Sequence, residues 1–153
     1  MTAISDRLAE LGVTIPTLPA PAGAYVPYAV SGNLVFTAGQ LPFTDGVLPA
    51  TGKVGAEVSP EDAKGYARTA VLNALAAVEA AIGSLDRFTR VVKLVGFVSS
   101  DPAFSGQPGV INGASDVLGE IFGEAGKHAR SAVGVAVLPL DSPVEVELIV
   151  EFA

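Results

Sequence analysis

The carboxyl-terminal stretch from Lys127 to Ala153 constrains the fold more than any other part of the chain. It contains two runs in which apolar residues alternate with small or acidic ones, and this two-residue period is typical of β-strands. The runs cover residues 130–137 and 144–152, and the short connection from Leu138 to Pro143 contains two prolines. The stretch therefore predicts a hairpin in which the two last strands pair with each other.

Arg130, which opens the first of these strands, is a candidate ligand-binding residue. Arg130 is expected on the same face of the strand as Ala132 and Gly134. Because these residues are small, its long side chain should lie beside a shallow surface with room for a small ligand. Arginine suits a small carboxylate because its planar fork donates two parallel hydrogen bonds and keeps its charge. The alternative is a surface or interface arginine paired with one of the 16 acidic residues.

Glu145, at the start of the second strand, is a candidate for activating a water molecule. This role needs a carboxylate that takes up a proton near neutral pH, and partial burial favours it by raising the pKa. The alternative is an acidic row that only meets solvent, because Glu145, Glu147 and Glu151 share one strand face. Strands paired about the turn would hold Arg130 and Glu145 at different depths, unless a neighbouring strand or subunit completes the site.

The N-terminal segment predicts a short helix and an extended connector. Ser5 and Asp6 precede RLAELGV, and Gly12 is suited to end the helix. Residues 14–24, TIPTLPAPAGA, contain three prolines and favour an extended path. Because a helix of about 10 residues is not stable by itself, we expect a single domain over residues 1–153 that includes this segment.

The middle of the chain supplies a hairpin, two helices and a strand. Ser31, Gly32 and Asn33 favour a tight turn, and Ser59 followed by Pro60 is a strong helix start. The predicted elements are strands at 25–30 and 34–38, a helix from 60 to about Ile82 with Gly83 after it, a strand at 91–99, and a second helix with Ile111, Ala114, Val117, Leu118, Ile121 and Phe122 inward. After the leading helix the order is β-β-α-β-α-β-β, which predicts an α+β domain with one mixed sheet covered by two helices.

The composition excludes several classes of partner. A net charge of −7 with nine Lys and Arg repels phosphate backbones, so nucleic acid is not an expected partner. No apolar run approaches the roughly 18 residues of a membrane span, and with no Cys there is no disulfide framework, so we expect a cytoplasmic protein. The apolar fraction is 50% and the mean hydropathy is +0.50, which favours burial of surface between copies of the chain.

Metal and phosphate sites have no support in the sequence. There is no Cys, and the single histidine, His128, belongs to no metal-ligand spacing. The glycines of GASDVLGEIFGEAG do not form a nucleotide-binding fingerprint. His128 lies two residues before Arg130 and could instead form a catalytic pair with one of several serines.

Two motifs in this order carry a family resemblance that covers nearly the whole chain. They are PYAVSGNLVFTAGQLP at residues 27–42 and ARSAVGVAVLP at residues 129–139, followed by Asp141 and the Glu145 strand. The chain resembles the Rid family, also called YjgF-like or endoribonuclease L-PSP-like proteins. The resemblance implies a chorismate-mutase-like (ferredoxin-like-type) α+β fold, a homotrimer with ligand clefts between subunits, and hydrolysis of reactive enamines and imines without a cofactor or metal.

The resemblance also assigns roles to residues. It implies that Arg130 binds the substrate carboxylate and that Glu145 is catalytic, with Glu147 as an alternative one pleat away. Tyr28 matches an active-site tyrosine, although hairpin packing explains it equally well. Ala38 and Gly39 match a segment that lines the cleft.

The sequence departs from the better-known enamine deaminases at two cleft positions. These enzymes commonly carry Ser where Ala38 stands and Cys where Ala132 stands, so two polar groups are missing, and Asn112 or Ser115 could fill the gap. The leading hypothesis is a deaminase for small 2-imino acids. The alternatives are a non-catalytic protein that binds small carboxylate metabolites and, third, an endoribonuclease or translation inhibitor.

Overall fold

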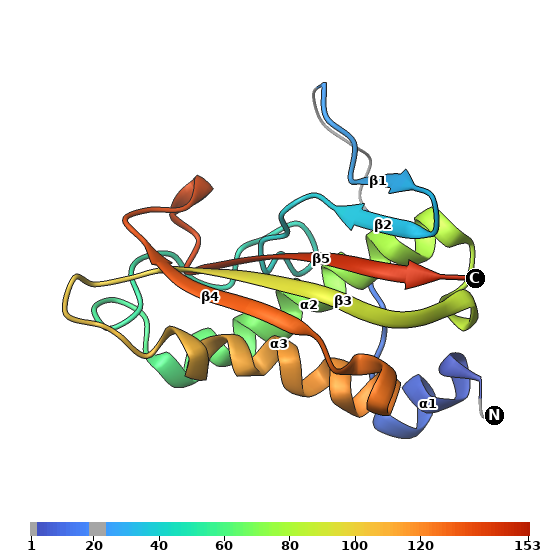
Figure 1. The fold of residues 1–153 in the computed structure, drawn as a ribbon. Coiled ribbons are helices and arrows are strands. Elements are labelled where there is room, and N and C mark those ends of the chain that lie inside the picture. The colour runs from blue at the N-terminus through green and yellow to red at the C-terminus, as the bar shows by residue number, and fades with distance from the viewer. Residues whose placement is uncertain (1–2, 19–23) are drawn as a thin grey trace.

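The computed structural model of the protein describes residues 3–18 and 24–153 (Figure 1). Part of the predicted connector, residues 19–23, lies outside the described residues. The order of helices and strands agrees with the order predicted from the sequence. The elements are α1 (Ile4–Leu11), β1 (Tyr28–Ser31), β2 (Leu34–Thr37), α2 (Pro60–Ile82), β3 (Phe88–Ser99), α3 (Gln107–Phe122), β4 (Ala129–Val135) and β5 (Val144–Phe152), with short 3-10 turns at Leu85–Arg87, Gly123–Gly126 and Pro139–Asp141.

The predicted pairing of the two last strands is wrong. The described strands form one mixed sheet in the order β1-β2-β5-β3-β4, so β3 separates β4 from β5. β3 runs parallel to β4 and antiparallel to β5. The parallel pair arises because α3 connects β3 to β4 and returns the chain to the same end of the sheet, as a βαβ crossover does.

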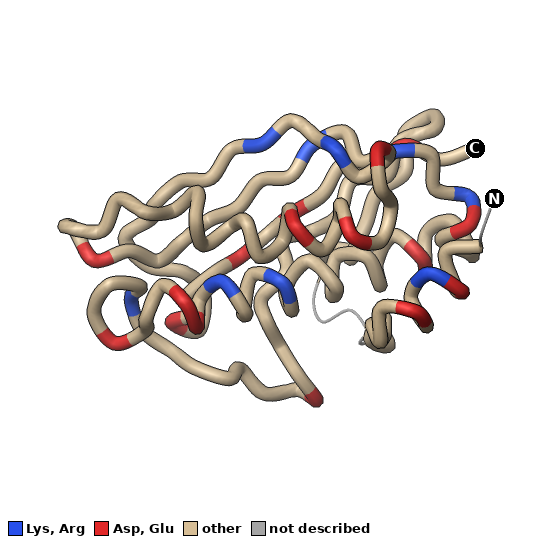
Figure 2. The backbone as a smooth tube through the Cα atoms, turned by 90° about the horizontal axis from the view of Figure 1, so that it is seen from below, with Lys and Arg blue, Asp and Glu red and all other residues tan. Residues whose placement is uncertain are grey.

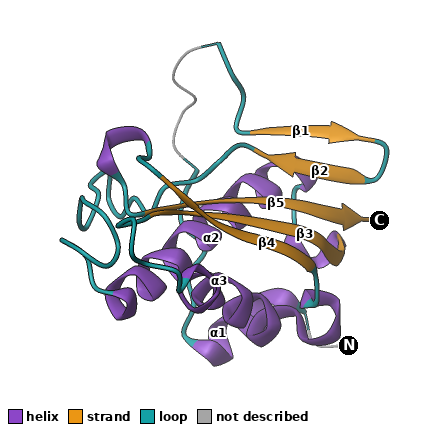
Figure 3. Cartoon of the chain, turned by 60° about the vertical axis from the view of Figure 1, so that its left-hand side comes forward, coloured by secondary structure: helices purple, strands orange, loops and turns teal. Residues whose placement is uncertain are grey.

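Helices α1, α2 and α3 lie on one face of the sheet (Figures 1 and 3). Alternate residues of β5 point toward the helices and are fully or almost fully buried: Val144, Val146, Leu148 and Val150. The residues between them lie on the open face, which also carries apolar side chains of β2, β3 and β4. Register places Phe36, Val95, Phe97, Val133 and Ile149 there.

Helix α2 begins and ends at the predicted residues for the predicted reasons. The hydroxyl of Ser59 accepts a hydrogen bond from the backbone N–H of Asp62 at 3.1 Å, and Gly83 after the helix has φ 84°. The low-relief alanine stripe along this helix faces the core, and Ala63, Ala67, Ala70 and Ala74 are all 0% exposed. Small side chains on this face allow α2 to pack closely on the sheet.

Helix α3 lies close to both α2 and the sheet because of two glycines. A Cβ on Gly113 would overlap the backbone carbonyl of Lys64 on α2, and a Cβ on Gly96 of β3 would overlap Ile111 on α3. On the solvent side, ion pairs Lys64–Asp116 and Arg68–Glu120 connect the two helices. Figure 2 shows both signs of charge interspersed along this side, and such exposed pairs contribute only about 0–1 kcal/mol each.

Helix α1 is attached to the same body. Its Arg7 Nε donates to the Glu120 carbonyl of α3 at 3.0 Å, and the backbone N–H of Ile4 donates to Asp86 Oδ1 at 2.7 Å. Gly12 ends the helix with φ 65°, as its position in the sequence predicted. The N-terminal helix therefore covers one end of α3.

Candidate functional site

Arg130 points toward helix α3. Its partner across the β3–β4 ladder is Leu94, which is fully buried on the helix side of the sheet. The Arg130 Nη1 group donates to Asn112 Oδ1 at 2.8 Å and to Ser115 Oγ at 3.1 Å. Its Nη2 group lies 3.5 Å from the carbonyl oxygen of Pro108. One end of the guanidinium is therefore held by the first half of α3.

The other edge of the Arg130 guanidinium is available. Among residues 3–18 and 24–153, no acidic side chain forms an ion pair with Arg130, and no group accepts a hydrogen bond from Nε. The alternative of an arginine paired with a neighbouring acid therefore does not hold within the described chain. Nε–H and the parallel N–H of Nη2 together form the planar fork that binds a carboxylate with two hydrogen bonds.

Asn112 and Ser115 come together at Arg130 because of helix and strand periodicity. They are three residues apart on α3 and so share one face of the helix. Ala132, two residues after Arg130 on β4, faces the same way and packs against the core below α3. The two residues expected to fill the polar gap of the cleft thus contact the candidate carboxylate-binding residue directly.

His128 joins the same group of side chains. Its Nε2 atom lies 2.9 Å from Ser115 Oγ, and its Nδ1 atom lies 2.6 Å from the carbonyl oxygen of Gly126. The sequence left open which serine His128 would meet, and the structure identifies Ser115. Two spacings in the sequence hinted at this group: residues 128 and 130 fall on one side of an extended chain, and residues 112 and 115 fall on one face of a helix. The sequence does not show the crossover that brings the two pairs together.

Glu145 lies on the open face of the sheet, beneath the segment that contains Ala38 and Gly39. Backbone hydrogen bonds between Gln40 and Val146, at 2.7 and 3.0 Å, hold this segment against β5. The contact with Gly39 is so close that a Cβ there would overlap Glu145 Oε1. Burial raises the pKa of Glu145 above its usual value, and the negative charge of Glu147 raises this pKa further.

The structure does not bring Arg130 and Glu145 together within one chain. Arg130 is opposite Leu94 and Glu145 is opposite Phe97 on the same strand β3. Since these two β3 residues are three apart, Arg130 and Glu145 point to opposite faces of the sheet. The two candidates can meet one ligand only if they come from different copies of the chain.

Tyr28 is also distant from Arg130 within one chain. It lies on β1, packs against the core, and pairs with Thr37 across the ladder. Because β1 and β4 are the two edges of the sheet, they are separated by four strand spacings, roughly 19 Å. A cleft that contains both Tyr28 and Arg130 would again need two chains.

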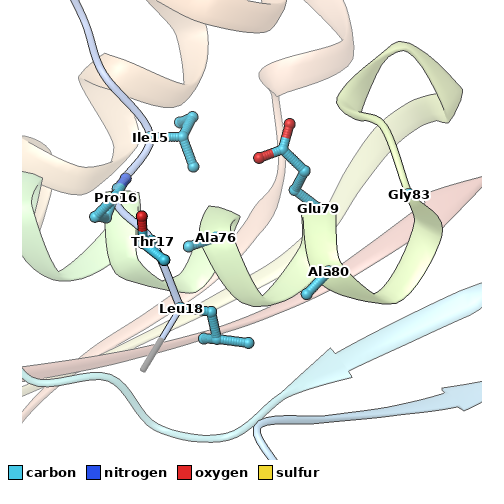
Figure 4. A pocket seen from close by; sticks show the side chains of 8 residues that line it. All are labelled: Ile15, Pro16, Thr17, Leu18, Ala76, Glu79, Ala80 and Gly83. Carbon is cyan, nitrogen blue, oxygen red and sulfur yellow. The ribbon is translucent and has the colours of Figure 1, made fainter. Parts of the chain in front are cut away.

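Two surface hollows lie elsewhere. The larger, about 490 Å³, is a groove between the connector and α2 that is shown in Figure 4 and lined by Ile15, Pro16, Thr17, Leu18, Ala76, Glu79, Ala80 and Gly83. The smaller lies where the N-terminal ends of α2 and α3 meet, near Lys64 and Phe104. Neither contains a predicted site residue. The described residues contain no group of three His, Cys, Asp or Glu side chains placed to hold a metal, and no described helix is both long and apolar enough to cross a membrane.

The chain matches a known family over almost its full length. Residues 5–152 match the family described as "YjgF/chorismate mutase-like, putative endoribonuclease". The chain belongs to this YjgF family. The mixed sheet with helices on one face is the architecture expected for the family, so the resemblance inferred from the two motifs and the predicted α+β fold are confirmed.

The chain is similar to a protein compared by sequence and to two solved structures. Protein TCP17 of Trypanosoma cruzi is 44% identical over 149 residues, which cover 97% of this chain and 93% of that protein. The crystal structure of protein Atu1372 from Agrobacterium tumefaciens is 46% identical, covers 98% of this chain and 92% of its own, and has a TM-score of 0.91. The structure of E. coli TdcF with bound serine is 28% identical, with a TM-score of 0.66 over 89% of this chain and 94% of its own.

The raised pKa of Glu145 predicts a pH-dependent stability. The folded protein holds the Glu145 proton more tightly than the unfolded chain, whose glutamates titrate near 4.5. The free energy of unfolding therefore falls as the pH rises from below 4.5 through the pKa of the folded state. Glu145→Gln removes this loss, so the variant should be more stable than wild type at pH 7, and the difference should vanish below about pH 4.

Urea unfolding at both pH values and one fixed protein concentration measures this difference. Glu147→Gln is the comparison variant. By lowering the pKa of Glu145, it should raise the free energy of unfolding at pH 7 by less than Glu145→Gln does, because the charge of Glu147 is only the smaller cause of the raised pKa. A gain for Glu145→Gln that is the same at both pH values would contradict an origin in ionisation.

Proposed function

We propose that this YjgF-family chain hydrolyses small 2-imino acids and their enamine tautomers to 2-oxo acids and ammonia, in a cleft between subunits of a homotrimer. The observation that carries the proposal is the geometry of Arg130. Its Nη1 end is fixed by Asn112 and Ser115, and its Nε–Nη2 edge has no acidic partner among the described residues. A half-buried guanidinium kept unpaired in a chain with 16 acidic residues is suited to an anionic ligand.

The substrate carboxylate would bind the free edge of Arg130. Two parallel charge-assisted hydrogen bonds fix the plane of the carboxylate as well as its position. In a 2-imino acid the reacting carbon is directly attached to this carboxylate, so binding also orients the imine carbon. The structure of TdcF, a relative, holds serine, which is a small molecule with a carboxylate.

Glu145 of a neighbouring subunit would activate the water. The raised pKa of this carboxylate lies closer to neutral pH than an ordinary glutamate pKa does, which makes proton transfer more effective. The water oxygen bonds to the carbon of the N-protonated imine, the C=N double bond becomes a single bond as its electron pair moves to nitrogen, and Glu145 accepts a water proton. In the tetrahedral intermediate the nitrogen then takes the proton from Glu145 and the carbon–nitrogen bond breaks to release ammonia. The proton of the remaining hydroxyl group passes to Glu145 and from there to ammonia, which yields a 2-oxo acid and ammonium.

The orientation of the two residues supports a site between chains. Arg130 and Glu145 point to opposite faces of one sheet, so a single ligand reaches both only across an interface. The open face of the sheet, where Glu145 lies, carries Phe36, Phe97 and Val133, of which Phe36 is 39% exposed and Val133 is 43% exposed. Burial of these apolar side chains against another subunit would favour association.

Two other functions have weaker support. A binding protein without turnover would keep the Arg130 geometry but would not need the raised pKa of Glu145. The family description includes endoribonucleases, yet the net charge of −7 and the mixed charges of the helical surface in Figure 2 disfavour an RNA substrate.

Arg130→Lys tests carboxylate recognition. The ammonium group keeps the charge but cannot form the planar fork, and one charge-assisted hydrogen bond contributes about 1.5–3 kcal/mol, so affinity should fall about ten- to hundredfold. Calorimetric titration with pyruvate and 2-oxobutanoate measures the affinity. Arg68→Lys, at an exposed ion pair with Glu120, is the matched control and should bind like wild type. Equal affinities for Arg130→Lys and wild type would make Arg130 a structural residue.

Glu145→Gln separates an enzyme from a binding protein. The amide keeps the shape and one acceptor but cannot take a proton from water, so turnover should fall by about 10² to 10⁴ with little change in ligand affinity. Ammonia release from 2-iminopropanoate or 2-aminoacrylate, generated in the assay, measures turnover. Equal activity of the variant and wild type would exclude Glu145 as the base, and Glu147→Gln would become the variant to measure.

Mixed oligomers test the location of the site. Arg130→Ala and Glu145→Gln should each be inactive, but co-refolding them in equal amounts creates some interfaces with both native residues. Random assembly of a cyclic trimer restores about a quarter of the sites, so about a quarter of the activity should return. Absence of recovery, or a light-scattering mass near the 15.4 kDa of one chain, would rule out the shared site.

A further inference from the structure

A continuous line of hydrogen bonds connects the backbone at Gly126 to Arg130. It passes from the Gly126 carbonyl to His128, from His128 to Ser115, and from Ser115 to the guanidinium, over distances of 2.6, 2.9 and 3.1 Å. The carbonyl oxygen can only accept and the guanidinium can only donate. These two fixed ends set the bonds at Gly126 and at Arg130, and the direction of the middle bond depends on the state of the His128 ring.

A neutral His128 ring protonated at Nδ1 satisfies the whole line. Nδ1 must carry a proton to donate to Gly126, and a neutral ring then leaves Nε2 as an acceptor. The Ser115 hydroxyl donates its single proton to that acceptor and offers a lone pair to Nη1 of Arg130. Every donor and acceptor along the line then has a partner.

A serine beside a neutral histidine resembles a nucleophile beside its base, but the surroundings of Ser115 do not suit that role. Ser115 lies in the middle of α3, where the backbone N–H groups are bonded to carbonyls one turn earlier and cannot stabilise an oxyanion. In addition, its oxygen already accepts a hydrogen bond from Arg130. The arrangement therefore fits support of the arginine better than attack on a substrate.

We propose that Ser115 and His128 are positioning residues that hold the Nη1 end of Arg130 and so direct its free Nε–Nη2 edge toward the ligand. Asn112 fixes the same Nη1 group from the preceding turn of α3. A long arginine side chain has several rotatable bonds, and restricting them before binding lowers the entropy lost on binding. This inference rests on the proposed function, because it assumes that the free edge binds a carboxylate.

Paired variants test the proposal by calorimetric titration with pyruvate. Ser115→Ala and His128→Ala each remove one bond of the line, and each should weaken binding by about three- to tenfold. Ser115→Thr keeps the hydroxyl and His128→Gln keeps an acceptor, so both should bind within about twofold of wild type. Ser105→Ala, at an exposed serine in the loop before α3, is the matched control and should bind like wild type.

Nuclear magnetic resonance of the unliganded protein provides a readout that does not depend on the ligand. The ¹⁵N shifts of His128 should show a neutral ring protonated at Nδ1. In wild type the Arg130 Nη protons should give separate, slowly exchanging signals, because rotation of the guanidinium is hindered, and Ser115→Ala should merge or broaden them. A charged ring or a ring protonated only at Nε2 would overturn the proposal, as would unchanged Arg130 signals in Ser115→Ala.

The two proposals fail in different ways. If Arg130→Ala abolishes pyruvate binding while Ser115→Ala and His128→Ala bind like wild type, only the positioning role is overturned. If wild type does not bind pyruvate or 2-oxobutanoate, or if Arg130→Ala binds them equally well, the proposed function itself is overturned. The magnetic resonance signals of Arg130 still report on the line of hydrogen bonds in that case.

Discussion

Strand β3 determines where every candidate residue points. It is bonded on one side to β4 and on the other to β5, and both registers are fixed by the buried side chains it places under the helices. Because successive residues of a strand alternate between faces, a shift of one residue in either register would reverse the orientation of Arg130 or of Glu145. Full burial of Val146 and Leu148 makes such a shift of β5 costly, since turning Glu145 inward would expose both to solvent.

Local signals in the sequence were sufficient for most elements but not for their pairing. Helix α2 is bounded by Ser59, Pro60 and Gly83, whose preferences act within a few residues and need no tertiary context. The pairing of β4 and β5 was mispredicted because a six-residue connection with two prolines resembles a hairpin loop. That connection instead crosses over β3, and Leu140 and Asp141 adopt φ 58°, a left-handed conformation that is uncommon for residues other than glycine.

The candidate site shows the same division between local and long-range information. Arg130 and Glu145 were identified from motifs, and the shared parity of Arg130 and Ala132 is a property of one strand. The contact of Arg130 with Asn112 and Ser115 depends on a helix returning across the sheet, and the contact of Glu145 with Gly39 depends on a loop bonded to β5. Such contacts join residues distant in sequence, which single-segment patterns do not specify.

Helix α3 packs against the core with one side and contacts Arg130 with another. One side approaches α2 at Gly113 and carries the buried residues Val110, Ala114 and Val117, while Asn112 and Ser115 reach Arg130 from another side. Exchanges at 112 and 115 therefore leave the buried apolar contacts of α3 in place. In evolutionary terms, ligand preference in a protein built this way can diverge through a few polar substitutions on one helix, without compensating changes in the core.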